Sequence, residues 1–209
     1  MSGHPNRVRV GVLASGRGSN LQAILDAASR EDFPARVVVV ASDRERAAAL
    51  ERATRAGVPA VFLNPKDFAD RAAYDLALER LLREHGVELV CLAGFMRILT
   101  PAFVRAFAGR VLNVHPSLLP AFPGLDAQRQ ALERGVRVAG ATVHFVDEGV
   151  DTGPIVLQAS VPVHPDDTEA SLSARILVEE HRLYPEAVRL FAQGRLTLVG
   201  RRVRVELDR

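Results

Sequence analysis

Apolar runs and amphipathic stretches alternate through the first half of the chain. Residues 7–13 carry valine at alternate positions, which predicts a strand, and a helical pattern begins directly after the glycine-containing loop 14–20. Further strands are predicted at 36–42, 60–63, 87–93 and 111–114, with helices in a stretch ending near 57, at 67–84 and from 101. Strands that alternate with helices imply a parallel sheet with right-handed crossovers.

The pattern changes in the second half. A short helix is predicted at 127–133, and the segments 141–146 and 154–161 read as strands whose connection is too short for a helical crossover, so we expect an antiparallel pair. A long helix capped by Thr168 is predicted to run to about 193, followed by a hairpin of 196–199 and 203–207. The sequence therefore predicts one α/β domain over 1–209, with a polar tail at 1–6. Its fold is Rossmann-like: a mostly parallel sheet flanked by helices, with an antiparallel C-terminal portion.

Composition excludes several classes of protein. The hydrophobic fraction is 48%, the charged fraction is 25% and the net charge is +2, as in ordinary globular domains. Basic residues are scattered and aromatic residues make up 5%, so we expect no nucleic-acid partner. No apolar run approaches membrane-spanning length, and the one cysteine, Cys91, lies in an apolar run, which together predict a cytoplasmic protein without disulfides.

Polar segments follow the carboxyl ends of the predicted parallel strands, where ligands of such sheets bind. These segments are residues 15–20, 42–43, 94–99 and 113–117. We expect them to converge on one rim, although they are far apart in the sequence.

The loop Gly16-Arg17-Gly18-Ser19-Asn20 at a strand-to-helix turn is a candidate phosphate cradle. Glycine lets the backbone approach an anion, and the unbonded amides of a helix start complement its charge. Leu21 stands where a dinucleotide loop has its third glycine, and a Walker lysine is missing, which favours a single phosphate. The alternative is a tight turn with Ser19 as the helix cap.

Asn113 and His115 are two positions apart on a strand and point to the same face. Both can donate hydrogen bonds, and together they can hold the oxyanion that forms when an amine attacks a formyl carbon. The alternative is a histidine satisfied by backbone contacts at a strand end.

The acidic loop 147–154 has two interpretations. It is either a solvated hairpin tip or the source of a carboxylate near His115, which would favour the protonated imidazole. His144 on the preceding strand is interpreted as a packed or surface residue rather than a catalyst.

On the long helix, Glu179 is predicted to project into the apolar face and Glu180 to lie at its edge. An acid there either reaches a polar ligand or forms a salt bridge with Arg175 or Arg182.

These motifs resemble the folate-dependent formyltransferases, and within them the phosphoribosylglycinamide formyltransferase family. The resemblance is carried by residues 15–20, 92–99, 113–120 and 150–154. It implies direct formyl transfer from 10-formyltetrahydrofolate to the glycinamide amine of phosphoribosylglycinamide in purine biosynthesis. It also implies no covalent enzyme intermediate, no metal, small-molecule partners only, and a monomer or homodimer.

The resemblance also assigns roles to residues of this chain. The catalytic residues would be Asn113, His115 and Asp151. The phosphoribosylglycinamide site would comprise Gly18, Ser19, Asn20, Leu21, Gln22 and Glu180. The folate site would comprise Arg71, Met96, Arg97, Ile98, Leu99 and Asn113. Asp43 and Asp126 depart from the family pattern, where relatives commonly have Asn and many have His, respectively. These departures concern details of substrate contact and not the reaction class.

Other functions fit the sequence less well. A formyltetrahydrofolate hydrolase shares the catalytic residues, but that family usually carries an additional N-terminal domain, and here the first predicted strand starts at Arg7. A methionyl-tRNA formyltransferase would be expected to carry a nucleic-acid-binding domain. A nucleotide-binding regulatory module would not explain Asn113 with His115.

Overall fold

The computed structural model of the chain describes residues 7–206, which form two compact units. The first ends at Leu112 and the second begins at Asn113. The predicted polar tail, residues 1–6, lies outside the described residues. The expectation of a single domain over 1–209 stays a prediction.

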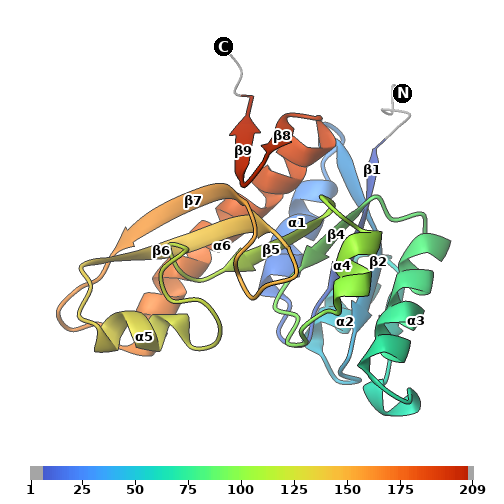
Figure 1. The fold of residues 1–209 in the computed structure, drawn as a ribbon, viewed down its shortest axis with the longest axis horizontal. Helices are drawn as coiled ribbons and strands as arrows, with labels where there is room; N and C mark the ends of the chain where they lie inside the picture. The colour runs from blue at the N-terminus through green and yellow to red at the C-terminus, as the bar shows by residue number, and fades with distance from the viewer. Residues whose placement is uncertain (1–6, 207–209) are drawn as a thin grey trace. The chain divides into compact units, whose positions relative to one another are not determined.

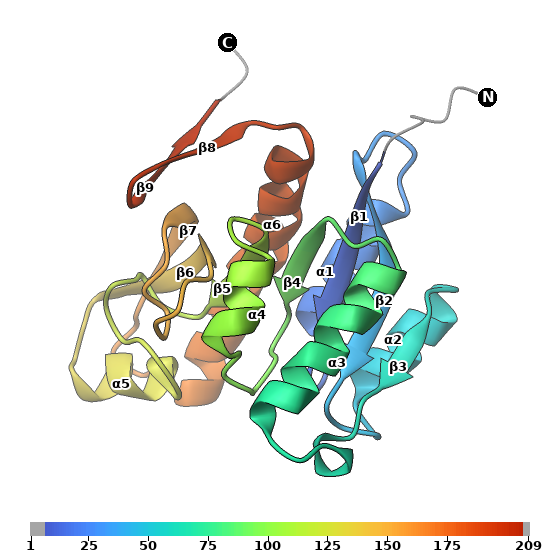
Figure 2. The same ribbon diagram turned by 45° about the vertical axis from the view of Figure 1, so that its right-hand side comes forward.

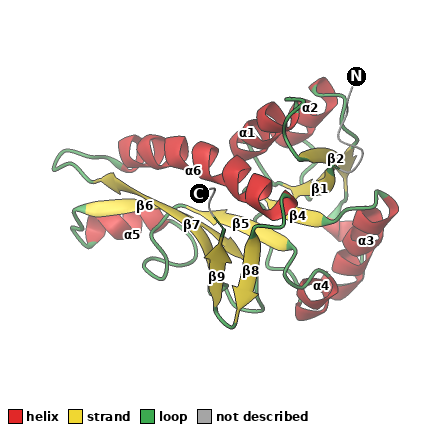
Figure 3. Cartoon of the chain, turned by 90° about the horizontal axis from the view of Figure 1, so that it is seen from above, coloured by secondary structure: helices red, strands yellow, loops and turns green. Residues whose placement is uncertain are grey.

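The first unit is an α/β layer structure in which helices cover both faces of a sheet (Figures 2 and 3). Its strands lie in the order β3-β2-β1-β4, and each neighbouring pair is parallel. Helices α1 and α2 lie on one face, and α3 and α4 on the other (Figure 3). The elements are β1 (Val8–Leu13), α1 (Ser19–Ala28), β2 (Ala35–Ser42), α2 (Ala48–Arg55), β3 (Ala60–Phe62), the 3₁₀ turn η1 (Pro65–Asp67), α3 (Arg71–Glu84), β4 (Leu89–Leu92) and α4 (Pro101–Ala106).

Burial explains why these segments form strands. Every residue of β4 is buried, and so are the last four residues of β1 and of β2. Parallel strands covered on both faces read as continuous apolar runs, as β4 and the valine run of β2 do, whereas β1 keeps an alternating pattern.

The predicted helix over 67–84 is wrong at its start. Pro65–Asp67 forms the separate turn η1, and α3 begins at Arg71 because the side chain of Asp70 accepts a hydrogen bond from the Ala73 amide at 2.8 Å. An aspartate that caps the first turn marks where the helix starts.

The second unit contains the strands β5 (Val111–His115), β6 (Val138–Phe145) and β7 (Ile155–Pro162), neighbours in that order (Figure 1). The first two residues of β5 still belong to the first unit. The pair β6–β7 is antiparallel, as predicted, and α6 (Glu169–Ala192) packs along both strands. The remaining elements are α5 (Ala127–Glu133) and the hairpin of β8 (Leu196–Val199) and β9 (Arg202–Val205).

The α/β fold class is thus confirmed, with a mostly parallel sheet flanked by helices and an antiparallel C-terminal portion. Strand β6 begins at Val138 rather than 141, because Val138 and Ala139 pair with Pro162 and Val161 of β7. No helix within residues 7–206 is both long and apolar enough to cross a membrane.

Candidate active site

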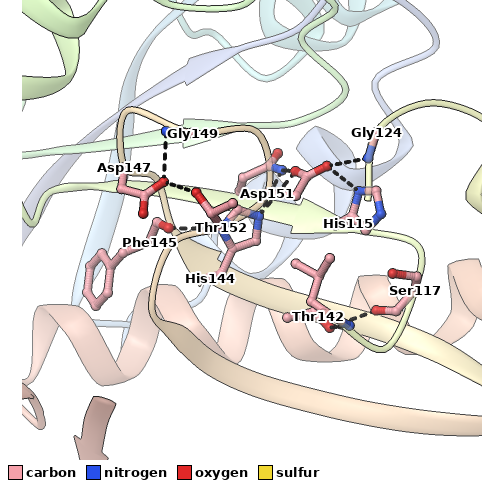
Figure 4. A network of polar contacts seen from close by, with 12 residues as sticks. His115, Ser117, Gly124, Thr142, His144, Phe145, Asp147, Gly149, Asp151 and Thr152 are labelled. Atoms are coloured by element: carbon pink, nitrogen blue, oxygen red, sulfur yellow. Dashed lines mark hydrogen bonds and ion pairs between the residues drawn. The ribbon is translucent and has the colours of Figure 1, made fainter. Parts of the chain in front are cut away.

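Strand β5 ends in a cluster of buried and partly buried polar side chains, drawn in Figure 4. His115 is 5% exposed, and its Nδ1 lies 3.3 Å from Oδ2 of Asp151. The amide nitrogen of Asn113 lies 3.4 Å from Oδ1 of the same carboxylate. The three side chains expected to be catalytic therefore meet around Asp151, which lies in the loop between β6 and β7.

The β6–β7 loop is shaped by its own hydrogen bonds. Oδ1 of Asp147 accepts from the Thr152 hydroxyl at 2.6 Å and from the Gly149 amide at 3.1 Å. Asp151 has a positive φ of 53°, a conformation that Asp and Asn tolerate better than most residues. A Cβ at Gly153 would lie 1.7 Å from the carbonyl oxygen of Phe145, so only glycine lets the loop return to the sheet here. The tip of the β8–β9 hairpin also contacts this loop, since Arg201 donates to the Thr152 carbonyl at 2.7 Å.

Opposing effects act on the pKa of the Asp151 carboxyl. Burial raises this pKa, but the nearby His144 ring, the Gly124 amide and the charge of His115 lower it, and together they outweigh burial. The Gly124 amide donates to Oδ2 at 2.8 Å. The pKa lies below its ordinary value, so Asp151 is an anion at neutral pH.

Both ring nitrogens of His115 face acceptors. Nδ1 faces Asp151, and Nε2 lies 2.8 Å from the carbonyl oxygen of Phe122. A ring with a proton on each nitrogen can donate to both acceptors at once. For Nε2 to act on a substrate, that substrate must take the place of the Phe122 carbonyl.

The segment that carries Phe122 is anchored on β6 through Thr142. The buried Thr142 hydroxyl donates to the Ser117 carbonyl at 2.7 Å and accepts from the Leu119 amide at 3.1 Å. Gln158 of β7 donates to the same hydroxyl and to the Leu119 carbonyl. The proline-containing exit from β5 is therefore held by its neighbours in the sheet.

His144 belongs to this cluster, which the sequence interpretation did not anticipate. The residue is packed, at 2% exposure, but its Nε2 lies 3.2 Å from the amide nitrogen of Asn113 and 3.6 Å from Asp151. Nδ1 lies 2.8 Å from the Phe145 carbonyl, which can only accept. Nδ1 therefore carries a proton, whereas Nε2 accepts from Asn113 in the neutral ring and, when protonated, faces Asp151 and lowers the pKa of that carboxyl. The signal was Thr142 with His144, a polar pair on one face of an apolar strand, the same pattern that pointed to Asn113 and His115.

In the first unit, the glycine loop is tightly packed against α2. Gly18 is the N-cap of α1, with φ 70°, and a Cβ there would lie 2.8 Å from the Ala49 backbone. Ser19 is the first residue of the helix and not its cap. Ser19, Asn20 and Leu21 thus contribute amides of the first helical turn, as a phosphate cradle requires.

Gln22 is held by hydrogen bonds within the protein. Its backbone amide donates to the Gly18 carbonyl at 2.9 Å, and its side-chain nitrogen donates to Asp26 at 2.8 Å. Its side-chain oxygen accepts from Arg52 at 3.0 Å. These hydrogen bonds favour a role for Gln22 in stabilising the glycine loop over direct contact with an anion.

The segment 94–99 lies beside the glycine loop. The Ser15 amide donates to the Gly94 carbonyl at 3.1 Å, and the Met96 amide donates to the Ser15 hydroxyl at 2.9 Å. Residues 42–43 follow β2, the neighbour of β1. The predicted rim segments of the first unit therefore lie together at the carboxyl ends of its strands.

The residues assigned to folate differ in exposure. Met96 and Ile98 are 60% and 62% exposed, whereas Leu99 is buried. The guanidinium of Arg97 lies over the Tyr74 ring, 4.7 Å from its centroid. Burial, helped by the Asp43 carboxylate, raises the pKa of Tyr74 far above its ordinary value. Arg71 is an exposed residue at the start of α3.

On α6, the two glutamates take the opposite positions to those predicted. Glu180 is 7% exposed within the buried face, whereas Glu179 lies outside that face and pairs with Arg182 at 2.8 Å. The buried face follows Leu172, Ile176 and Glu180 at steps of four residues, which leaves Glu179 beside it. Arg175 pairs with Asp167 instead.

The structure also gives the surroundings of Asp43 and Asp126, the two residues that depart from the family pattern. Asp126 has φ 56°, precedes α5 without capping it through its side chain, and pairs with Arg129. Oδ1 of Asp43 is buried without a hydrogen-bond partner in the described part of the chain.

Comparison with known proteins places these observations in a family. A family model described as formyl transferase matches residues 8–188. The chain belongs to the formyl transferase family. Among formyl transferase relatives, the phosphoribosylglycinamide formyltransferase of Escherichia coli (strain K12) is 48% identical over 187 residues, 90% of this chain and 88% of that protein. The trifunctional purine biosynthetic protein adenosine-3 of Drosophila melanogaster is 53% identical over 190 residues, and the chain spans only 14% of its length.

Solved structures with a similar fold support this family assignment. Glycinamide ribonucleotide transformylase 1 from Symbiobacterium toebii matches with a TM-score of 0.95 and 58% identity, over 100% of both chains. A formyltetrahydrofolate deformylase from Pseudomonas syringae pv. tomato matches with a TM-score of 0.89 but 27% identity, over 96% of this chain and 66% of that one. The fold is common to both enzymes, and the sequence is more similar to the transformylase.

Proposed function

We propose that the chain transfers a formyl group from 10-formyltetrahydrofolate to the glycinamide amine of phosphoribosylglycinamide, a step of purine (IMP) biosynthesis. The observation that carries the proposal is the cluster of buried His115 with partly buried Asn113 and Asp151 in a chain of the formyl transferase family. The high identity to proteins named phosphoribosylglycinamide formyltransferase supports the choice of substrate.

In the proposed reaction the substrate amine attacks the formyl carbon directly. A carbon–nitrogen bond to the amine forms, the formyl oxygen becomes an oxyanion, and the bond to N10 of the folate then breaks. The attacking nitrogen loses a proton and N10 gains one, so the folate leaves as tetrahydrofolate. No covalent bond to the enzyme is required.

The side chains of the cluster suit this reaction. His115 and Asn113 can both donate hydrogen bonds to the oxyanion, where charge develops in the transition state. His115 also supplies the proton that N10 takes up. Asp151 stays ionised, so it stabilises a positive charge on His115 and anchors the relay of protons away from the amine.

Binding roles follow from the family resemblance and the local geometry. Gly18, Ser19, Asn20 and Leu21 would hold the substrate phosphate, with Gln22 in support, and Glu180 would meet the ribose or glycinamide end. Arg71, Met96, Arg97, Ile98, Leu99 and Asn113 would contact the folate. We further propose that the chain acts as one formyltransferase domain, in the cytoplasm and without a metal.

The deciding measurement is tetrahydrofolate release from 10-formyltetrahydrofolate, with and without phosphoribosylglycinamide. We expect release that depends on the amine and matches formation of the formylated product. Release that ignores the amine would instead identify a formyltetrahydrofolate hydrolase.

Two substitutions test the catalytic cluster. His115→Ala and Asp151→Asn should each lower kcat by ~10²-fold or more, the range for loss of a general acid or its partner, while substrate binding largely survives. His164→Ala is the control, because His164 is an exposed residue outside the cluster. Near wild-type turnover in either cluster variant would refute the assignment.

A further inference from the structure

The first turn of helix α2 packs against the glycine loop. Helices α1 and α2 lie side by side on the same face of the sheet (Figure 3). The Ala49 amide donates to the Gly16 carbonyl at 3.1 Å, and the backbone of Ala49 leaves no room for a side chain at Gly18. One side of the loop is therefore closed by the first turn of α2.

Arg52, one turn further along α2, bridges the two ends of the segment 18–21. Its Nε donates to the Arg17 carbonyl at 2.9 Å, just before Gly18, and its Nη1 donates to Oε1 of Gln22 at 3.0 Å, just after Leu21. Gln22 is held in turn by Asp26, which accepts from its Nε2 at 2.8 Å. Arg52 can only donate hydrogen bonds, and the Asp26 carboxylate can only accept them. The hydrogen bonds from Arg52 to Gln22 and from Gln22 to Asp26 therefore fix the orientation of the Gln22 side-chain amide.

The bridge matters for an anion because it fixes the loop on both sides of its amide donors. The first-turn amides of a helix bind a phosphate best when they already point at one place, since ordering them on binding costs free energy. Arg52 also brings a positive charge to the loop, and the half-buried guanidinium is already occupied by two hydrogen bonds within the protein.

We propose that Arg52 is a positioning residue that holds the Gly18–Leu21 segment in its phosphate-binding form. This inference rests on the proposed function, in which that segment binds the phosphate of the amine substrate. Arg52 acts through Arg17 and Gln22 and not by contact with the reacting atoms.

The test compares Arg52→Met with Arg55→Met. Methionine keeps an unbranched chain but removes the charge and the donors. Arg55 is a matched control, because it is an exposed arginine of the same helix whose partner is Glu51 on the surface. The substrates are phosphoribosylglycinamide and the same molecule without its phosphate.

For Arg52→Met we expect the KM for the phosphorylated amine to rise about tenfold, the size of effect of one charge-assisted hydrogen bond. The kcat, the KM for 10-formyltetrahydrofolate and the KM for the unphosphorylated amine should stay within about twofold of their wild-type values. A twofold change is small beside the tenfold change expected for one hydrogen bond. Arg52→Lys should recover part of the loss, since lysine keeps the charge but not the two-pronged geometry. Arg55→Met should behave as wild type.

Hydrogen exchange of the Gln22 amide, which donates to the Gly18 carbonyl at 2.9 Å, gives a readout that does not depend on activity. We expect faster exchange in Arg52→Met than in wild type and in Arg55→Met. Unchanged exchange would overturn the proposal whatever the enzyme does. Faster exchange with an unchanged KM for the phosphorylated amine would also overturn it, and would leave formyl transfer itself intact, whereas absence of transfer in the wild type would refute the proposed function.

Discussion

At the scale of single residues, the cluster at the end of β5 depends on which atoms donate and which accept. In the neutral state of His144, Nε2 accepts a hydrogen bond from Asn113, and the second proton of that amide points to Asp151. Both donors of Asn113 are engaged within the protein in that state. The longer bond, 3.4 Å to Asp151, is the one that an oxyanion can replace most easily.

This arrangement predicts a role for His144 in catalysis. His144→Ala removes the acceptor that orients the Asn113 amide, so we expect kcat to fall by roughly tenfold, the size of one hydrogen bond that orients a donor, with a smaller change in either KM. Steady-state kinetics of formyl transfer measures both. A kcat within twofold of wild type would mean that Asn113 keeps its orientation without His144.

The lowered pKa of Asp151 predicts a pH-dependent contribution to stability. An unfolded aspartate titrates near 4, and the native carboxyl titrates lower, so its stabilising effect is complete above that value and is lost as the pH falls through the native pKa. Asp151→Asn should therefore melt below wild type at pH 6, and the gap should narrow as the pH falls below about 4.

Thermal melts of both proteins from pH 3 to 7 measure this gap. Asparagine is the suitable replacement, because it tolerates the positive φ at this position. A gap that does not change with pH would show that the loss comes from packing and not from ionisation.

At the scale of elements, local signals located helices and strands well where a cap or an apolar run marks them. Helix α5 spans the predicted residues, and α6 begins directly after the predicted cap. The start of α3 was missed because Asp67 and Asp70 are both suitable caps, and only the structure shows which one accepts from the helix. Cap identity depends on the backbone entry to the helix, which periodicity does not report.

The cap of α6 gives a stability prediction. Thr168 and Ser171 form a reciprocal capping box at the start of the helix that carries Glu180. Thr168→Ala should cost about 1 kcal/mol, or a fall in Tm of roughly 2–4 °C for a chain of this size. Ser173→Ala in the helix interior is the control and should not lower Tm. An equal fall in both variants would contradict the capping role.

At the scale of the whole molecule, the sequence predicted which residues carry polar chemistry better than it predicted their partners. Asn113 with His115 was recognised from a two-residue spacing, which is a local property. The contact of Asp151 with His115 joins positions that are far apart in the chain. Residue patterns left this contact open, the family resemblance implied it, and the β6–β7 loop brings the two side chains together. The same limit applies to Arg52, whose contacts with Arg17 and Gln22 leave no periodic trace in the sequence.

The buried position of Cys91 has a practical consequence for following this protein in solution. Cys91 is the only cysteine in the chain, and it is 0% exposed within β4. A thiol introduced at an exposed position such as Val150, beside Asp151, would be the only one that a maleimide dye can reach in the folded state. The chain therefore needs no cysteine removed before single-site labelling, and fluorescence from such a dye would show whether the β6–β7 loop changes its surroundings during turnover.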